Sequence, residues 1–214
     1  MDRTLIRLFQ EKTFRDPVFI DLSSEAGTAP YEVGITLLEN TRAERIGEVY
    51  SPHLPDYAIS EESGLCHLPR FDIYAATKVT PNLVILTGAE HLDPDDVQAH
   101  YELADIILKN ATAMGCRRFA TCTAIRSKKA EEKIYIAATN SAETIQITER
   151  HGGKPFSLGR IMIPTGPLLG LARTNGHKVL CIIGIIAEDQ TEEETAQLLY
   201  DYLVGALELK TEQQ

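Results

Sequence analysis

The residues best suited to chemistry stand together in "EHLDPDD", residues 90 to 96, which holds one Glu, one His and three Asp. Carboxylates and imidazoles are metal ligands, and either group can act as a general base. His100 follows Asp96 by four residues, a spacing that places two side chains on one face of a helix. The pattern therefore raises the question of a metal site or an activated water.

The same acids also carry the signals of a helix start. Asp93 can accept hydrogen bonds from the first free backbone N–H groups, and Pro94 suits the first helical position. Asp95 and Asp96 would lie near the positive end of the helix dipole. The sequence contains no HExxH pattern. We therefore expect a helix that starts at Asp93, no metal and no cofactor. Glu90 precedes this cap and has no such explanation, so it stays a candidate site residue.

Small or polar residues follow four segments that have the composition of strands. These endings are Leu22-Ser23-Ser24, Thr87-Gly88, Thr139-Asn140 and Thr165-Gly166. Ligands of open α/β sheets bind outside the carboxyl ends of the strands, so the endings could line one cleft. Tight turns need the same residue types without any ligand. Both interpretations stay open, and the candidate ligand-binding or partner-contact residues are Ser23, Thr87, Gly88, Glu90, Thr165 and Gly166.

Signatures of other active sites are missing from the sequence. Thr165-Gly166 precedes a predicted helix whose free N–H groups could bind an anion, but no Walker lysine accompanies it. No GxGxxG or GxSxG pattern occurs, and the histidines are scattered along the chain. We therefore predict no catalytic residue.

Strands and helices alternate along the chain, which indicates an α/β sheet covered on both faces. Additional hairpin strands near residues 46 to 80 predict a mixed sheet. Short connections favour a single domain, residues 1–214, with a core at about 17–208 between an N-terminal extension and a C-terminal tail. The predicted helices are 29–44, 93–115, 140–152, 167–176 and 191–207, and the main strands are 17–24, 117–124, 132–139, 160–166 and 177–188.

Composition limits the classes of partner and compartment. The chain of 214 residues has 31 acids and 21 bases, a formal net charge of −10, which disfavours a nucleic-acid partner. The four cysteines form no CxxC pair, which is typical of a reducing cytoplasm. The longest apolar stretch, 179–187, is too short to span a bilayer, and the N-terminus lacks a signal-peptide core. We expect a cytoplasmic protein without membrane contact.

Several stretches, in order and spacing, resemble the archaeal and bacterial members of the proteasome assembly chaperone family. They are "RIGEVYSPHLPDYAI", "NLVILTGAEHLD" with "YELADIILKNATAMGCRR", "KIYIAATN", "TGPLLGLARTNG" and "VLCIIGIIAE". The resemblance implies a three-layer α/β/α sandwich on a mixed, mostly parallel sheet, like that of phosphorylases and related hydrolase-like folds. It further implies a non-enzymatic protein-interaction module that promotes ring formation by proteasome α-subunits, and a homo-oligomer.

The chain departs from this family pattern at two places. Relatives usually carry a glycine-rich turn after the first strand, whereas Gly27 and Gly34 are widely separated here. Some archaeal members end in a hydrophobic-Tyr-any tail that docks on the proteasome. This sequence ends in "KTEQQ", and Leu199-Tyr200-Asp201 spells the pattern only inside the last predicted helix.

A second function class stays open beside the chaperone hypothesis. The protein could bind a small molecule, an anion or a nucleoside, or act as an enzyme of phosphorylase-like fold. Its site would be formed by the strand ends at Ser23, Thr87, Thr139 and Thr165, together with the helix start at Gly166. The chaperone hypothesis predicts a protein partner and no turnover, whereas this alternative predicts a ligand in one cleft.

Overall fold

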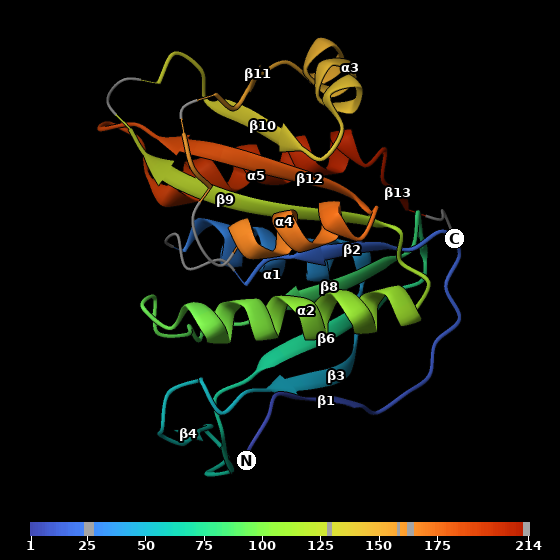
Figure 1. Ribbon diagram of the computed structural model, residues 1–214, viewed down its shortest axis with the longest axis vertical. Helices are drawn as coiled ribbons and strands as arrows, with labels where there is room; N and C mark the ends of the chain where they lie inside the picture. Colours follow the sequence, from blue (N-terminus) through green and yellow to red (C-terminus); the bar gives the residue numbers. More distant parts are fainter. Residues whose placement is uncertain (24–27, 128–129, 158, 162–164, 212–214) are drawn as a thin grey trace.

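A nine-stranded mixed sheet forms the centre of the molecule (Figure 1). The computed structural model describes residues 1–214 except 24–27, 128–129, 158, 162–164 and 212–214. Four central strands, β8, β2, β9 and β12, are parallel, and antiparallel strands flank them on both sides. Across the sheet the order is β1 (Leu5–Leu8), β3 (Glu44–Tyr50), β6 (Phe71–Ala76), β8 (Leu83–Thr87), β2 (Val18–Asp21), β9 (Arg118–Arg126), β12 (Lys178–Ile186), β10 (Ile134–Ala138) and β11 (Lys154–Pro155).

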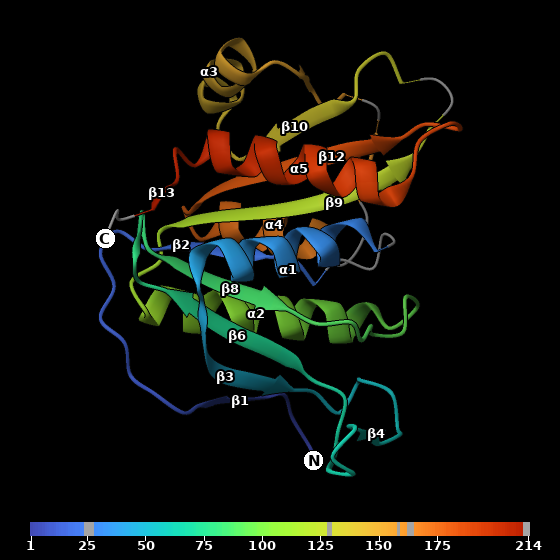
Figure 2. The ribbon, with the colours of Figure 1, turned by 180° about the vertical axis from the view of Figure 1, so that it is seen from behind.

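Helices cover the sheet on both faces. Helices α1 (Ala29–Thr41) and α5 (Glu192–Ala206) lie on one face, as Figure 2 shows. Helices α2 (Val97–Ala113) and α4 (Thr165–Thr174) lie on the other, and α3 (Ser141–His151) packs beside β10. The mixed α/β/α architecture predicted from the sequence is therefore confirmed.

The strands of the sheet centre are mostly apolar and are buried on both faces, because helices cover both faces. In β12 every residue after Lys178 is buried, and Leu180 and Ile182 pack under α1 and α5. Val179 packs on the opposite face with α2 and α4. Full burial of an Ile or Leu side chain contributes about 1.5–3 kcal/mol.

Local signals fix most of the helix ends. The Thr191 hydroxyl accepts a hydrogen bond from the Glu194 N–H at 3.1 Å, and the Glu194 carboxylate accepts one from the Thr191 N–H at 3.0 Å. This capping box starts α5 where the sequence predicts it. Gly115 and Gly176 follow the ends of α2 and α4 with φ of +94° and +75°, values that glycine adopts without strain.

The predicted N-cap of α2, Asp93, lies three residues before the observed N-cap, Asp96. The helix begins at Val97, and the Asp96 carboxylate accepts a hydrogen bond from the Ala99 N–H at 3.0 Å. This bond is the chief cause that lowers the pKa of Asp96. Asp93 caps the preceding turn, where its carboxylate accepts from the Asp95 N–H at 3.0 Å. Two acids compete for the capping role, and the sequence alone does not rank them.

The strand predicted at 160–166 is not found in the described part of this segment. Arg160 and Ile161 are outside any strand, and Thr165 and Gly166 form the first residues of α4. The residues between them, 162–164, lie outside the described residues. A short apolar run has no clear periodicity, so the sequence alone does not distinguish a strand from the segment that leads into a helix.

Both flanking segments pair with the core. Strand β1 lies within the predicted N-terminal extension and pairs antiparallel with β3. Near the other end, β13 (Lys210–Thr211) pairs antiparallel with β7 (Val79–Thr80). A separate hairpin, β4 (Ile59–Ser60) and β5 (Cys66–His67), projects from the β1 end of the sheet (Figures 1 and 2).

Candidate functional site

The four strand endings do not line one cleft. Strand β10 runs antiparallel to β12. Thr139, which follows β10, therefore lies at the end of the sheet where the parallel strands begin. There its hydroxyl donates to the His177 carbonyl at 3.1 Å and accepts from the Val179 N–H at 3.0 Å. Thr139 thus closes a turn near the amino ends of the parallel strands, whereas Asp21 and Thr87 lie at their carboxyl ends.

Thr87 and Thr165 lie on opposite faces of the sheet. A β-carbon added to Gly34 of α1 would lie 3.1 Å from the Thr87 hydroxyl oxygen, so Thr87 faces α1. Thr165 starts α4, whose residues Leu168 and Ala172 pack with α2 on the other face. The sheet itself separates these two candidate residues.

The candidate glycines have packing reasons for their small size. A β-carbon at Gly88 would lie 2.7 Å from the ring of Phe71 on β6. At Gly166 it would lie 2.5 Å from the Ile161 carbonyl oxygen, so the backbone approaches closely there. Both contacts account for glycine without a ligand.

Ser23 donates hydrogen bonds to a buried acid, Asp21, that no sequence motif singles out. The Asp21 carboxylate, at 5% exposure, accepts hydrogen bonds from the Ser23 hydroxyl at 2.6 Å and the Ser23 N–H at 3.1 Å. Burial raises the pKa of Asp21, and these two hydrogen bonds oppose the rise only in part. A buried titratable group of this kind is a functional-site candidate.

Asp21 also lies at the point where the chain changes direction across the sheet. From β2 the chain leads through α1 to β3, toward one edge, whereas from β9 it leads to β10, toward the other. Asp21 pairs directly with buried Thr121 of β9, and the N-terminus of α4 lies at the same edge of the sheet (Figure 1). Ligands of open α/β sheets bind at such points. The available sequence signal was an acid between apolar residues at the end of a strand.

Glu90 has a structural partner. Its carboxylate accepts a hydrogen bond from the Tyr57 hydroxyl, which raises the pKa of Tyr57. Nearby, His53 Nδ1 lies 3.1 Å from the Asp96 carboxylate, and His53 Nε2 lies 3.5 Å from that of Glu102. These contacts join the loop after β3 to the start of α2. Among the described residues no cluster of three His, Cys, Asp or Glu side chains could hold a metal.

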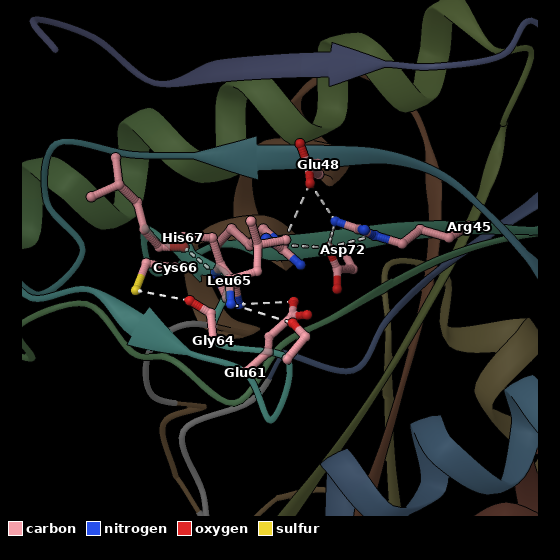
Figure 3. Close-up of polar contacts among 11 residues, drawn as sticks. Arg45, Glu48, Glu61, Gly64, Leu65, Cys66, His67 and Asp72 are labelled. Carbon is pink, nitrogen blue, oxygen red and sulfur yellow. Dashed lines mark hydrogen bonds and ion pairs between the residues drawn. The ribbon is translucent and has the colours of Figure 1, made fainter.

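A network of ion pairs covers part of the sheet near the β1 edge (Figure 3). Arg45 lies 2.6 Å from Asp72 and also pairs with Glu48. Arg70 lies 3.1 Å from Asp72 and 3.6 Å from Glu48, whose side chain is only 9% exposed. Two cations and two carboxylates satisfy one another, so the network holds β3 and β6 together at the base of the projecting hairpin.

Exposed apolar side chains gather at the same end of the molecule. On the projecting segment 56–68, hereafter the arm, Tyr57, Leu65 and Leu68 are 50%, 64% and 54% exposed. On β1 and the residue after it, Leu5 and Phe9 are 48% and 45% exposed. Exposed apolar groups that gather in this way are typical of protein contacts.

One sizeable groove lies away from all the candidate residues. It has a volume of about 1060 Å³ and lies between α5 and the loops at 130–133 and 187–190. Acidic residues dominate its described lining: Glu131, Glu132, Glu188, Asp189, Glu194 and Asp201. The negative charge of these six carboxylates disfavours an anionic ligand in the groove.

The fold defines a three-layer α/β protein with an open mixed sheet. The model of the PAC2 family matches residues 23–213, and the chain belongs to this family. No curated protein sequence matches the chain.

Solved structures share the fold over nearly the whole chain. Pyrococcus furiosus PbaB, an archaeal proteasome activator, matches at 20% identity and TM-score 0.88, covering 98% of this chain and 91% of that one. Pyrococcus furiosus PbaA, an archaeal homolog of proteasome-assembly chaperone, matches at 19% identity and TM-score 0.77, covering 97% and 82%. Mycobacterium tuberculosis Rv2125, a proteasome-assembly chaperone homologue, matches at 13% identity and TM-score 0.69, covering 91% and 86%.

The Thr87 hydroxyl makes no hydrogen bond to any residue that the structure describes, and it is buried beneath α1. We expect Thr87→Val to stabilise the protein by about 1 kcal/mol, because valine keeps the shape and removes an unsatisfied polar group. The unfolding midpoint in a thermal melt should rise by about 2–4 °C. Thr195→Val is the matched control, since the hydroxyl of Thr195 donates to the Thr191 carbonyl at 3.1 Å and should give no gain. A lower midpoint for Thr87→Val would show that the hydroxyl has a function in folding.

The raised pKa of Asp21 predicts a stability that depends on pH. The folded state keeps this proton at pH values where the unfolded chain has lost it, so stability falls as pH rises through the folded pKa. Asp21→Asn imitates the protonated acid. We expect it to melt higher than wild type at pH 8, by roughly 1 kcal/mol or 2–4 °C, and to match it near pH 4.

Asp105→Asn is the control for this comparison. Asp105 lies on the surface of α2 and pairs with exposed Lys109 at 2.6 Å. Its replacement should change the melting curves little at either pH. A melting difference between Asp21→Asn and wild type that does not change with pH would contradict the assignment of a raised pKa.

Proposed function

We propose that the protein is a non-enzymatic assembly chaperone that binds proteasome α-subunits and helps them to form rings. The observation that carries this proposal is the match of the PAC2 family over residues 23–213. The shared fold with an archaeal proteasome activator and with an archaeal homolog of a proteasome-assembly chaperone supports it. The proposal includes a cytoplasmic location and a homo-oligomeric state. No helix in the described ranges is long and apolar enough to cross a membrane.

The folded surface would make the contact with α-subunits in this proposal. The segment Leu199-Tyr200-Asp201 lies within α5, where Leu199 is fully buried and the Tyr200 hydroxyl accepts from the Asn40 amide at 2.9 Å. These residues are therefore held in the helix and do not form an extended docking tail.

The test is reconstitution with purified proteasome α-subunits from the same source. We expect a complex in size-exclusion chromatography with light scattering, and faster appearance of α-rings on native gels when the protein is added in stoichiometric amount. Serum albumin at equal concentration controls for crowding. Absence of both the complex and the rate increase would contradict the proposal. A pull-down from a lysate of the source would then identify the partner actually bound.

The buried acid at the carboxyl end of β2 favours a second candidate function, the binding of a nucleoside-like small molecule. Asp21, Ser23 and Thr121 place a carboxyl and two hydroxyls together where the chain direction changes. A carboxyl group recognises hydroxyl or amine donors, whereas an anion such as phosphate would be repelled by its ionised form. The Asp21 carboxyl therefore favours a nucleoside over an anion as the ligand in this second candidate function.

Thermal shifts separate the two functions. If the protein acts only as a chaperone, neither nucleosides nor inorganic phosphate at millimolar concentration will move the unfolding midpoint. A rise with nucleosides that disappears in Asp21→Asn would support the binding site. A rise with phosphate alone would contradict the role assigned to the Asp21 carboxyl.

A further inference from the structure

The arm carries apolar side chains that its own fold leaves exposed. Strands β4 and β5 pair only over Ile59–Ser60 and Cys66–His67, and they form a sheet of their own. The tip is nevertheless well defined: the Glu61 N–H donates to the Leu65 carbonyl, and the Gly64 N–H to the Glu61 carbonyl, both at 2.9 Å. Leu65 and Leu68 are therefore displayed on an ordered projection.

The arm is also acidic. Residues 56–68 contain Asp56, Glu61 and Glu62 and no Lys or Arg. All three acids are exposed. A surface that covers the arm must therefore combine apolar contact with positive charge.

The β1 edge, residues 3–9, offers this combination on the same molecule. Leu5, Leu8 and Phe9 are 48%, 43% and 45% exposed, and Arg3 and Arg7 lie among them. The guanidinium carbon of Arg7 lies 5.7 Å from the centre of the Phe9 ring, and that of Arg45 lies 5.5 Å from it. The positive charge of this apolar edge thus comes from Arg3 and Arg7, since Arg45 is paired with Asp72 and Glu48.

Strand β1 is a short edge strand that carries one charged residue, Arg7, and two exposed leucines. It is the outermost strand of the sheet, paired on one side with β3. The other edge strand, β11, consists of Lys154 and Pro155, residue types that block pairing with another chain. Strand β1, with the sequence LIRL, has no proline and exposes leucine, so it is open to a further contact.

We infer that two copies of this chain associate through these surfaces, the arm of each copy lying on the β1 edge of the other. Figures 1 and 2 both show the arm and the N-terminal strand at the same end of the molecule. A two-fold axis at this end brings each arm to the partner's β1 edge, so the contact forms twice and closes. Acidic residues of the arm then face arginines, and Leu65 and Leu68 pack on Leu5 and Phe9.

The inference specifies how the homo-oligomer included in the proposed function is built. It concerns contacts between copies and is tested on the protein alone. Wild-type protein should have twice the mass of one chain in sedimentation velocity or light scattering. The arm variant Leu65→Asp/Leu68→Asp and the edge variant Leu5→Asp/Phe9→Asp should each be monomeric, with dimer affinity weakened by roughly 100-fold or more, since each would bury carboxylates.

Mixing the two variants gives the decisive measurement. An equimolar mixture should form dimers more readily than either variant alone, because one of the two contacts then joins an intact arm to an intact edge. Ile145→Asp is the matched control: Ile145 is 53% exposed on α3, at the opposite end of the molecule, and its replacement should leave the dimer unchanged. Melting curves establish that each variant folds.

A charge reversal tests the same contact without adding charge to the apolar positions. The variant Glu61→Lys/Glu62→Lys should have a lower dimer affinity than wild type. Mixing it with Arg3→Glu/Arg7→Glu should restore dimer formation. A monomeric wild type, or a dimer that is insensitive to the arm variants, would overturn the inference. Failure of the arm and edge variants to recover dimers on mixing would point to contact of like surfaces and would also overturn it. These outcomes leave binding of added α-subunits as a separate result.

Discussion

The structure depends on the need to bury four parallel strands on both faces. Strands β8, β2, β9 and β12 are mostly apolar and buried along most of their length, so each face requires a layer of helices. Helices α1 and α5 supply one layer, and α2 and α4 supply the other. This requirement explains why Gly34 and Gly184 are glycines: a β-carbon at Gly184 would lie 2.8 Å from the Thr195 side chain of α5. The other parts of the molecule are arranged around this sandwich.

The same constraint leaves the β1 end of the sheet different from its centre. Beyond β8, the face that carries α1 continues over β6, β3 and β1, where Figure 2 shows no described helix in front of the strands. Polar residues replace apolar ones there, and the Arg45, Glu48, Arg70 and Asp72 network satisfies its own charges. The arm leaves the sheet from this region, between β3 and β6. The uncovered end of the sheet is thus the region where exposed apolar side chains and charged side chains lie together.

The buried acid and the exposed arm support different functions. Asp21 lies at a position where α/β proteins bind ligands, but its hydrogen bonds to Ser23 also account for part of its environment. The arm and the β1 edge have apolar residues that the fold leaves uncovered. Exposed apolar surface is unfavourable in water unless a partner covers it, which fits a protein that acts through association. The membership of the chain in the PAC2 family agrees with this emphasis on protein contacts.

The sequence by itself determined the α/β class, most helix ends and the apolar strands, because these follow from local periodicity and capping. Thr191 with Glu194 is an example, since the cap needs only residues three positions apart. Only the tertiary structure decided which strand ends are neighbours: Thr139 lies at the opposite edge because β10 is antiparallel, and Thr87 and Thr165 are separated by the sheet. It also decided that Asp21 is buried, that Glu90 holds Tyr57, and that the N-terminal segment adds β1. Strand order and facing depend on contacts between residues far apart in sequence, and a local pattern does not contain them.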